Sequence, residues 1–222
     1  MSDTGGRTPL SRAAQEGDDG AVKPLLEREG VNPHMSDKRG QTPLSWAASN
    51  WRGQAENVMK LLLEREEANP WMTEYGGRTP LLWAAFNVWS AVEDVIKPLW
   101  GQEDVNPDMP DNCGRTPLPP AAPNWHCQAE NIVKLLLEAE GVKPDMPDND
   151  GRTPLSWAGS NWNSRAEQAV QLLLWRKDVK PNMPDNDGRT PLSGVAERGL
   201  WEVLKPLLGR EDVISYVADN RG

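Results

Sequence analysis

One triplet, Thr-Pro-Leu, returns along the chain at a nearly constant interval and limits the possible folds more than any other feature. Its threonines are Thr8, Thr42, Thr79, Thr116, Thr153 and Thr190, so the successive intervals are 34, 37, 37, 37 and 37 residues. A fixed period of roughly 20 to 50 residues is typical of a solenoid, in which one supersecondary unit is stacked many times. We therefore expect a single elongated domain of six repeats, at about residues 1–33, 34–70, 71–107, 108–144, 145–181 and 182–222.

The most complete copy of the motif is PDNDGRTPLSWA, residues 147–158. Its Asp150-Gly151 pair suits a tight two-residue hairpin turn, because glycine and, less readily, aspartate adopt a positive φ. Thr153 can accept a hydrogen bond from a free backbone N–H at a helix start, and Pro154 suits the first helical position. The motif therefore predicts a turn followed at once by a short inner helix.

A second apolar pattern follows each inner helix, as in Val58, Met59, Leu62 and Leu63, and its spacing indicates an outer helix and no strand. Extended segments such as Val105-Asn106-Pro107 come next, because proline biases the preceding residue away from helix. The expected fold class is all-α: stacked helix pairs joined by hairpin-like turns. One pair cannot bury its own apolar face, so each repeat needs its neighbours.

Composition excludes several function classes. The formal charge of −9 argues against a nucleic-acid partner, whose phosphates require clustered Lys and Arg. No apolar run approaches the roughly 20 residues that span a bilayer, and the N-terminal residues lack an apolar signal core. We expect a monomeric protein that does not bind membranes and resides in the cytoplasm, or else in the nucleus.

Residues suited to catalysis are scarce. The only histidines are His34 and His126, and no nucleophile elbow, phosphate-binding glycine loop or paired zinc spacing is present. His126 stands beside Cys127, but a structural zinc ion requires four ligands. The sequence predicts no enzyme, no cofactor and no metal site.

The motifs TPLSWAA and PDNDGRTPLSWA resemble those of ankyrin-repeat proteins, in particular the near-consensus arrays of filamentous fungi, and the resemblance covers nearly the entire chain. It implies an L-shaped unit, in which a hairpin finger precedes two antiparallel helices. It also implies a curved solenoid that binds a partner protein through its concave face and finger tips.

The sequence also departs from that family. Where a histidine usually follows Thr-Pro-Leu, this chain has Ser11, Ser45, Leu82, Pro119, Ser156 and Ser193. Repeats two to five carry three extra residues between their helices, where Trp51, Trp125 and Trp162 are expected to continue the core face. Pro119, Pro120 and Pro123 predict irregular backbone in the fourth inner helix.

A row of arginines is the first candidate for partner binding. Arg7, Arg78, Arg115, Arg152 and Arg189 follow successive turn glycines, with Gln41 at the same place in repeat two. Two interpretations stay open. The arginines could pair with Asp111, Asp148 and Asp185 of the turns, or they could bind acidic or phosphorylated residues of a partner.

Tryptophans and finger tips supply the other candidates. Trp46, Trp83 and Trp157 stand two residues after the core leucine, about 200° around the helix, so they either pack on the next repeat or form an exposed stripe that anchors a partner. At the tips, the resemblance implies ligand contacts from Lys38, Arg39, Tyr75, Asn149 and Asp150. Turn chemistry alone explains the last two.

The sequence therefore favours a scaffold or recognition module that binds another protein. Two alternatives remain: a partner-sensing fragment of a larger signalling receptor or enzyme, and a small-ligand binder that uses the tryptophan stripe.

Overall fold

The computed structural model describes residues 2–50, 55–65, 69–86, 92–100, 102, 105–121, 129–160, 166–216 and 220. The regular elements of these residues are all helices. They group into two compact units, Met1–Asn112 and Cys113–Gly222. The expectation of one continuous six-repeat domain stays a prediction. The expectations for Trp51, Pro123, Trp125, the His126-Cys127 pair and Trp162 concern residues outside the described ranges.

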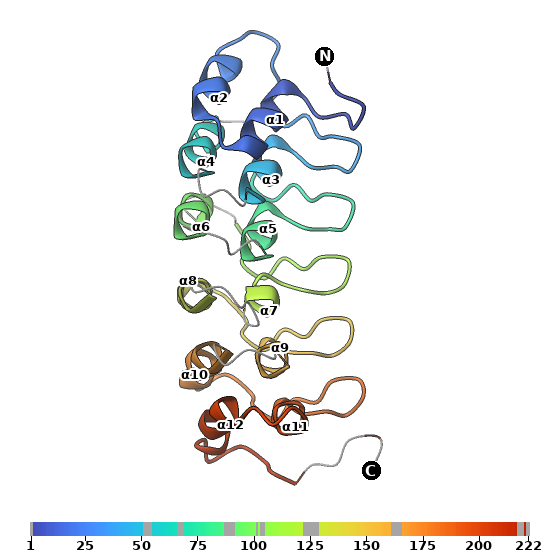
Figure 1. The fold of residues 1–222 in the computed structure, drawn as a ribbon, viewed down its shortest axis with the longest axis vertical. Helices are drawn as coiled ribbons and strands as arrows, with labels where there is room; N and C mark the ends of the chain where they lie inside the picture. Colours follow the sequence, from blue (N-terminus) through green and yellow to red (C-terminus); the bar gives the residue numbers. More distant parts are fainter. Residues whose placement is uncertain are drawn as a thin grey trace. The chain divides into compact units, whose positions relative to one another are not determined.

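Unit 1 is built from three helix pairs: α1 Pro9–Glu16 with α2 Asp19–Leu26, α3 Pro43–Ala48 with α4 Ala55–Leu63, and α5 Pro80–Phe86 with α6 Val92–Trp100. The inner helices α1, α3 and α5 form one column and the outer helices α2, α4 and α6 form another (Figure 1). Each helix packs on its partner and on the equivalent helix of the next repeat. The predicted helix pairs and their stacking are confirmed.

Unit 2 repeats the arrangement with α7 Leu118–Ala121 and α8 Ala129–Glu138, α9 Pro154–Gly159 and α10 Ala166–Trp175, and α11 Pro191–Glu197 and α12 Trp201–Leu208. Its inner helices are α7, α9 and α11, and a loop precedes each of them on the side away from the outer helices (Figure 1). We call these loops the fingers. The core lies between the two columns, where Leu155, Val170 and Leu173 are fully buried.

Threonine and serine together begin the inner helices. The Thr153 Oγ1 atom accepts a hydrogen bond from the Ser156 N–H at 3.2 Å, and the two hydroxyl oxygens lie 3.2 Å apart. The same cap forms from Thr8 to Ser11 and from Thr42 to Ser45. Thr79 caps its helix in the same way with the Leu82 N–H, at 3.1 Å, so the backbone N–H three residues after the threonine closes the cap whether or not that residue is serine.

Two prolines lie inside α7, contrary to the predicted irregular backbone. Pro119 and Pro120 are buried residues of this four-residue helix. A helix accepts proline in its first turn because the N–H that proline lacks has no intrahelical acceptor there. Pro123 lies outside the described residues.

Each finger reverses over four residues. In repeat five the Gly151 N–H donates to the Asp148 carbonyl at 2.9 Å, and Gly151 has the expected positive φ of 78°. The predicted two-residue turn at Asp150-Gly151 is therefore shifted, because the turn spans residues 148–151. The Asp148 carboxylate fixes this turn, since its Oδ1 atom accepts the N–H groups of Asp150 at 3.0 Å and Arg152 at 2.9 Å.

Candidate functional site

Asparagines at residues 112, 149, 186 and 220 bind a finger to the preceding one. The Asn186 N–H donates to the Asp150 carbonyl at 2.9 Å, and its Nδ2 donates to the Asn149 carbonyl at 3.0 Å. In unit 1, Asn112 makes the same two bonds to the carbonyls of Gly76 and Tyr75, both at 2.9 Å. Sequence reasoning missed this role of asparagine, although its return at residues 112, 149, 186 and 220 was a usable signal.

The finger tips of repeats two and three expose side chains that do not recur. The Tyr75 N–H donates to the Arg39 carbonyl at 2.9 Å, which places Arg39 and Tyr75 on touching fingers. Lys38 and Arg39 are exposed, and Tyr75 is 76% exposed. We call Lys38, Arg39 and Tyr75 the tip patch. It combines two positive charges with an exposed aromatic ring.

The other predicted tip residues, Asn149 and Asp150, have roles in the stack. The Asn149 N–H donates to the Cys113 carbonyl at 2.9 Å, and the Asp150 carbonyl accepts the Asn186 N–H. The Asp150 carboxylate is exposed and lies 3.6 Å from the Arg152 guanidinium. Its side chain is therefore accessible, while its backbone holds the neighbouring finger.

Two of the three candidate tryptophans bond to a buried aspartate of their own finger. The Trp157 Nε1–H donates to Asp148 Oδ2 at 2.9 Å, and the Trp46 Nε1–H donates to Asp37 Oδ2 at 3.2 Å. Both aspartates are buried and both tryptophans are half-buried. Sequence reasoning missed this contact, although the aspartate stands nine residues before the tryptophan in both repeats.

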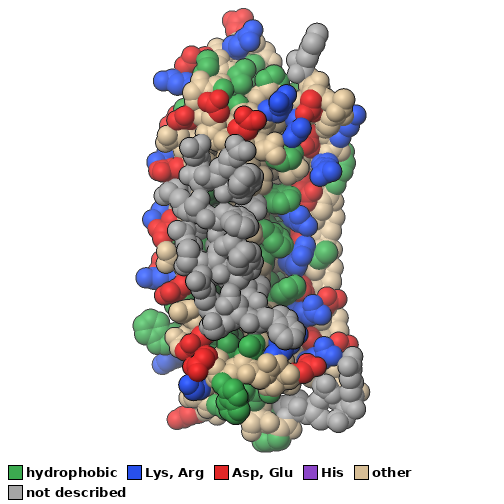
Figure 2. All heavy atoms as spheres, in the orientation of Figure 1, with side chains coloured by type: hydrophobic (Ala, Val, Ile, Leu, Met, Phe, Trp, Pro, Cys, Tyr) green, Lys and Arg blue, Asp and Glu red, His purple; other side chains and the backbone are tan. Residues whose placement is uncertain are grey.

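Arginines of the predicted row lie over the indole rings. The guanidinium carbon of Arg152 is 5.6 Å from the Trp157 ring centre, and that of Arg7 is 5.6 Å from the ring of Trp46. Arg78 is 4.8 Å from the ring of Trp83. These distances fall within the roughly 6 Å of a cation–π contact. Figure 2 shows basic side chains beside hydrophobic ones on the finger side of each unit.

The row also makes ion pairs, mostly with other aspartates than those predicted. Arg78 pairs with Asp111 as expected, at 3.9 Å, whereas Arg189 pairs with Asp187 at 3.7 Å. Asp185 instead accepts the backbone N–H of Arg189 at 2.9 Å, as Asp148 does for Arg152. Arg115 is half-buried at the corresponding place. The side chains of Arg78, Arg152 and Arg189 remain partly exposed, between 25% and 39%.

Arginines at the ends of outer helices form a separate structural set. The Arg210 Nη1 donates to the Leu174 carbonyl of the preceding repeat at 3.0 Å, and Arg210 also pairs with Asp212 through two contacts of 2.9 Å. Arg176 donates in the same way to the Leu137 carbonyl and pairs with Asp178. The hydrogen bonds from Arg176 hold the pKa of Asp178 below its ordinary value. These contacts join repeats, and sequence reasoning missed them.

Asp145 joins two repeats in another way. Its carboxylate accepts the Lys180 N–H at 2.9 and 3.1 Å, and Asn182 accepts the Ile214 N–H one repeat later at 2.8 Å. Burial raises the pKa of Asp145, although the bond from Lys180 and its charge act in the opposite direction. The uncharged Asn182 therefore accepts the same kind of backbone N–H from the next repeat as the charged Asp145 does.

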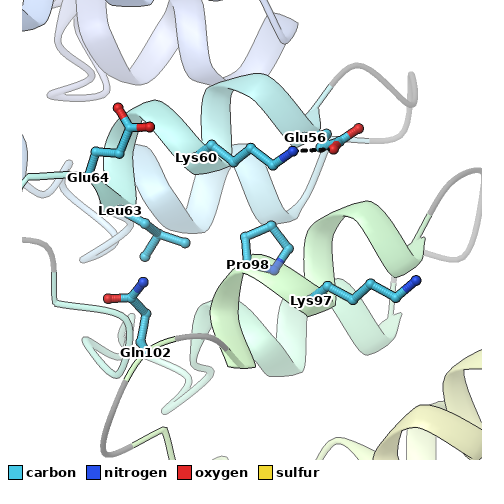
Figure 3. Close-up of a pocket in the computed structure, with 7 residues that line it drawn as sticks. All are labelled: Glu56, Lys60, Leu63, Glu64, Lys97, Pro98 and Gln102. Atoms are coloured by element: carbon cyan, nitrogen blue, oxygen red, sulfur yellow. Dashed lines mark hydrogen bonds and ion pairs between the residues drawn. The ribbon is translucent and has the colours of Figure 1, made fainter.

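The hollow drawn in Figure 3 lies in unit 1 between α4 and α6 and has a volume of about 490 Å³. Leu63 and Gln102 point toward each other across it, and Lys60 pairs with Glu56 at its edge. A similar hollow of about 500 Å³ in unit 2 includes Trp175, whose side chain is 89% exposed. Neither hollow contains a residue of the candidate set.

Clusters of metal ligands and membrane-spanning helices are absent from the described part of the chain. No group of three or more His, Cys, Asp or Glu side chains there could hold a metal ion. None of the helices in those ranges has the length and apolar character needed to cross a bilayer.

Comparison with known proteins identifies related sequences and folds. The family model for ankyrin repeats, in three copies, matches residues 10–111 and 88–183. The fold is similar to EF0377, an ankyrin-repeat protein, with 24% identity, a TM-score of 0.78 and coverage of 95% of this chain and 100% of that one.

Two further solved structures are similar. An ankyrin-repeat domain from Acinetobacter baumannii AYE is 27% identical, with a TM-score of 0.71 and coverage of 90% of this chain and 96% of that one. The ankyrin-repeat domain of Bcl-3, a member of the IkappaB family, is 25% identical, with a TM-score of 0.77 and coverage of 97% and 91%. No curated protein matches the sequence.

Proposed function

The chain belongs to the ankyrin-repeat family, and from that premise we propose that it is an interaction module whose finger tips and inner-helix face bind a partner protein. One observation carries the proposal: recurring residues make the finger and cap contacts of the stack, while the side chains at the tips of repeats two and three, which do not recur, are exposed to solvent. The recurring Asn186, Gly151 and Thr153 make finger and cap contacts. The variable Lys38, Arg39 and Tyr75 lie exposed at the tips.

The chemistry of this surface favours an acidic segment of the partner. The arginine row and the tip patch place guanidinium and ammonium groups beside aromatic rings, although the chain as a whole has a charge of −9. Exposed ion pairs such as Arg152 with Asp150 contribute little, so an incoming carboxylate can replace them at small cost. Arginine and tyrosine are also common among residues that dominate binding energy.

The geometry disfavours a small-ligand site on the tryptophan stripe. The indole N–H groups of Trp46 and Trp157 are bonded to aspartates, and a guanidinium lies over one face of each ring. A module within a larger receptor or enzyme would bind its partner through the same fingers. Catalytic sequence next to these repeats in the parent gene would distinguish that alternative from a separate scaffold protein. The resemblance to the arrays of filamentous fungi is a hypothesis about the origin of the chain. It does not alter the proposed protein-binding function or its alternatives.

Affinity capture from a cell extract tests the proposal. We expect partner proteins to be captured by the full chain and lost when Arg115, Arg152 and Arg189 are all changed to Glu. The matched control changes three exposed lysines, Lys23, Lys134 and Lys177, to Glu, which alters the net charge equally. Circular dichroism confirms that both variants are folded. Equal capture by both variants would contradict the proposal that the arginine row contacts the partner.

A further inference from the structure

Repeat six differs from most of the other repeats at one position of its inner helix and at the residue that directly follows that helix. Four residues after the capping threonine, repeats two, three and five have Trp46, Trp83 and Trp157, whereas repeat six has Gly194. Eight residues after that threonine, repeats two to five all have asparagine, whereas repeat six has Arg198. A large side chain is therefore lost inside α11, and a positive charge is gained at the C-cap of the same helix.

The two changes leave a hollow between α9 and α11, entirely within unit 2. Its volume is about 150 Å³, and its lining includes Arg152, Arg189, Arg198, Ser156, Ser160 and Asp185. By the same measure a single water molecule needs only about 10–15 Å³. The Arg198 Nη1 donates to the Gly194 carbonyl at 3.0 Å and lies 3.8 Å from where a Cβ atom of residue 194 would be, so Arg198 occupies part of the place that tryptophan fills in repeats two, three and five. We call this space the repeat-six hollow.

Positive charge dominates the lining. Three guanidinium groups face one carboxylate, that of Asp185, whose Oδ1 atom is held by the N–H groups of Asp187 at 3.0 Å and Arg189 at 2.9 Å. At the rim, Asp150 and Asp187 lie 3.6 and 3.7 Å from Arg152 and Arg189, and their side chains are 70% and 61% exposed. Such long, solvated pairs are weak and readily exchanged.

Guanidinium groups match one class of ligand in particular. Their planar set of N–H donors binds the oxygens of carboxylates and phosphates through two parallel hydrogen bonds. The asparagine of repeats two to five and the tryptophan of repeats two, three and five, which stand at these positions, present no such charge. The arrangement in repeat six is therefore suited to an oxyanion.

We propose that the repeat-six hollow is an oxyanion subsite, which binds a phosphorylated or carboxylate side chain from an acidic segment of a partner protein. This inference rests on the proposed function, because Arg152 and Arg189 of the subsite belong to the arginine row that is proposed to contact the partner. Arg152, Arg189 and Arg198 hold the oxyanion, and the absence of a side chain at Gly194 makes the room.

NMR titration of the full chain with inorganic phosphate tests the subsite, with sodium chloride at equal ionic strength as the control for screening. We expect saturable shifts of the Nε–H signals of Arg152, Arg189 and Arg198. The Arg198→Asn variant should weaken binding at least tenfold, and the Gly194→Trp variant should abolish it. Both substitutions copy residues that this chain already uses at these positions, so both variants should fold.

The control variant is Arg28→Asn, which removes an exposed arginine of unit 1 and should leave binding unchanged. Titrations with three short peptides, containing phosphoserine, glutamate or unmodified serine at one position, then identify the source of the oxyanion. Stronger binding of the first indicates a phosphorylated partner, and stronger binding of the second indicates a carboxylate. Equal binding of the serine peptide, or phosphate shifts that survive Arg198→Asn, would overturn the proposal.

The two proposals can fail separately. A chain that binds phosphate in this hollow but captures no protein contradicts the proposed function alone. A chain that captures a protein equally well with Gly194→Trp and Arg198→Asn, and shows no phosphate shifts, contradicts only the subsite.

Discussion

Trp157 shows how a single residue connects a finger to its helix. Its indole N–H donates to the buried Asp148, and that carboxylate also fixes the turn by accepting two backbone N–H groups. Arg152, held by the same turn, lies over the indole ring. The turn, the helix and Arg152 are therefore connected through one carboxylate and one indole ring. We expect the loss of one donor to destabilise all three.

Trp157→Phe removes the N–H but keeps an aromatic ring under Arg152. We expect the free energy of unfolding to fall by about 1.5–3 kcal/mol, because a buried carboxylate loses a donor. Urea denaturation measures the change. Trp201→Phe is the control, since Trp201 is the first residue of α12 and is 70% exposed. Similar losses in both variants would contradict the role of the Asp148 contact.

The fingers are the elements that approach each other most closely, so the space at their turn glycines is limited. A Cβ atom on Gly151 would lie 2.6 Å from Asn186 Oδ1 and 2.9 Å from the Asn186 nitrogen, whereas one on Gly141 would have nothing within 4 Å. Both glycines have a positive φ, 78° and 81°. Substitution of the two glycines can therefore distinguish the energetic cost of the left-handed backbone from the cost of a clash with the next finger.

Gly141→Ala should cost only the strain of a left-handed residue, about 1–2 kcal/mol. Gly151→Ala should cost at least about 1 kcal/mol more, because it also pushes the neighbouring finger away. The midpoints and slopes of urea denaturation give both free energies. Equal losses would mean that the fingers are not in the close contact described.

The segment between repeats should respond to pH through Asp145. Because burial raises its pKa in the folded chain, the folded state binds the proton more tightly than the unfolded state. The charged carboxylate therefore lowers stability above the folded pKa, and this cost disappears as the pH falls through that pKa. Asn182 shows that an asparagine makes the equivalent backbone bond.

Asp145→Asn should raise the free energy of unfolding at pH 7 by about 0.5 kcal/mol, and the gain should shrink toward pH 3. Asp178→Asn should behave in the opposite way. Its pKa is lowered by Arg176, so the carboxylate stabilises above the unfolded pKa and loses this effect as the pH falls through the folded pKa. Urea denaturation across this pH range measures the free energy of unfolding of both variants. A change of the same sign in both variants at pH 7 would contradict the opposite roles given to Asp145 and Asp178.

At the scale of the whole molecule, stability comes from neighbours. In each unit the helices in close contact belong to the same repeat or to adjacent repeats. The inner helices are also short, six residues in α9 and four in α7, well below the roughly 12–15 residues at which an isolated helix becomes marginally stable. A helix pair without neighbours therefore lacks both local and tertiary support.

A peptide of residues 145–181, one complete repeat, should be unfolded in water, whereas the full chain should be helical. Far-UV circular dichroism at equal residue concentration tests this. The peptide retains the Thr153 cap and the Asp148 turn, so it separates local signals from stacking. A helical peptide would show that local signals suffice.

Local rules made part of the structure predictable from sequence. The Thr-Pro-Leu period, the capping threonines and the turn glycines predicted the helix pairs and the positive φ of Gly151, because these features depend on residues within a few positions of each other. The same reasoning placed Lys38, Arg39 and Tyr75 at finger tips, where they are exposed. It was wrong about the backbone at Pro119 and Pro120, because both lie in the first turn of α7, where the N–H that proline lacks has no intrahelical acceptor.

The sequence by itself determined which segments turn and which form helices, because capping, glycine conformation and apolar spacing act over short distances. Only the tertiary structure decided that Trp157 bonds to Asp148, that Asn186 binds the preceding finger and that Gly194 and Arg198 adjoin Arg152. These contacts form between a helix and its finger, or between one repeat and the next. They depend on the distance between stacked elements, which no short segment specifies.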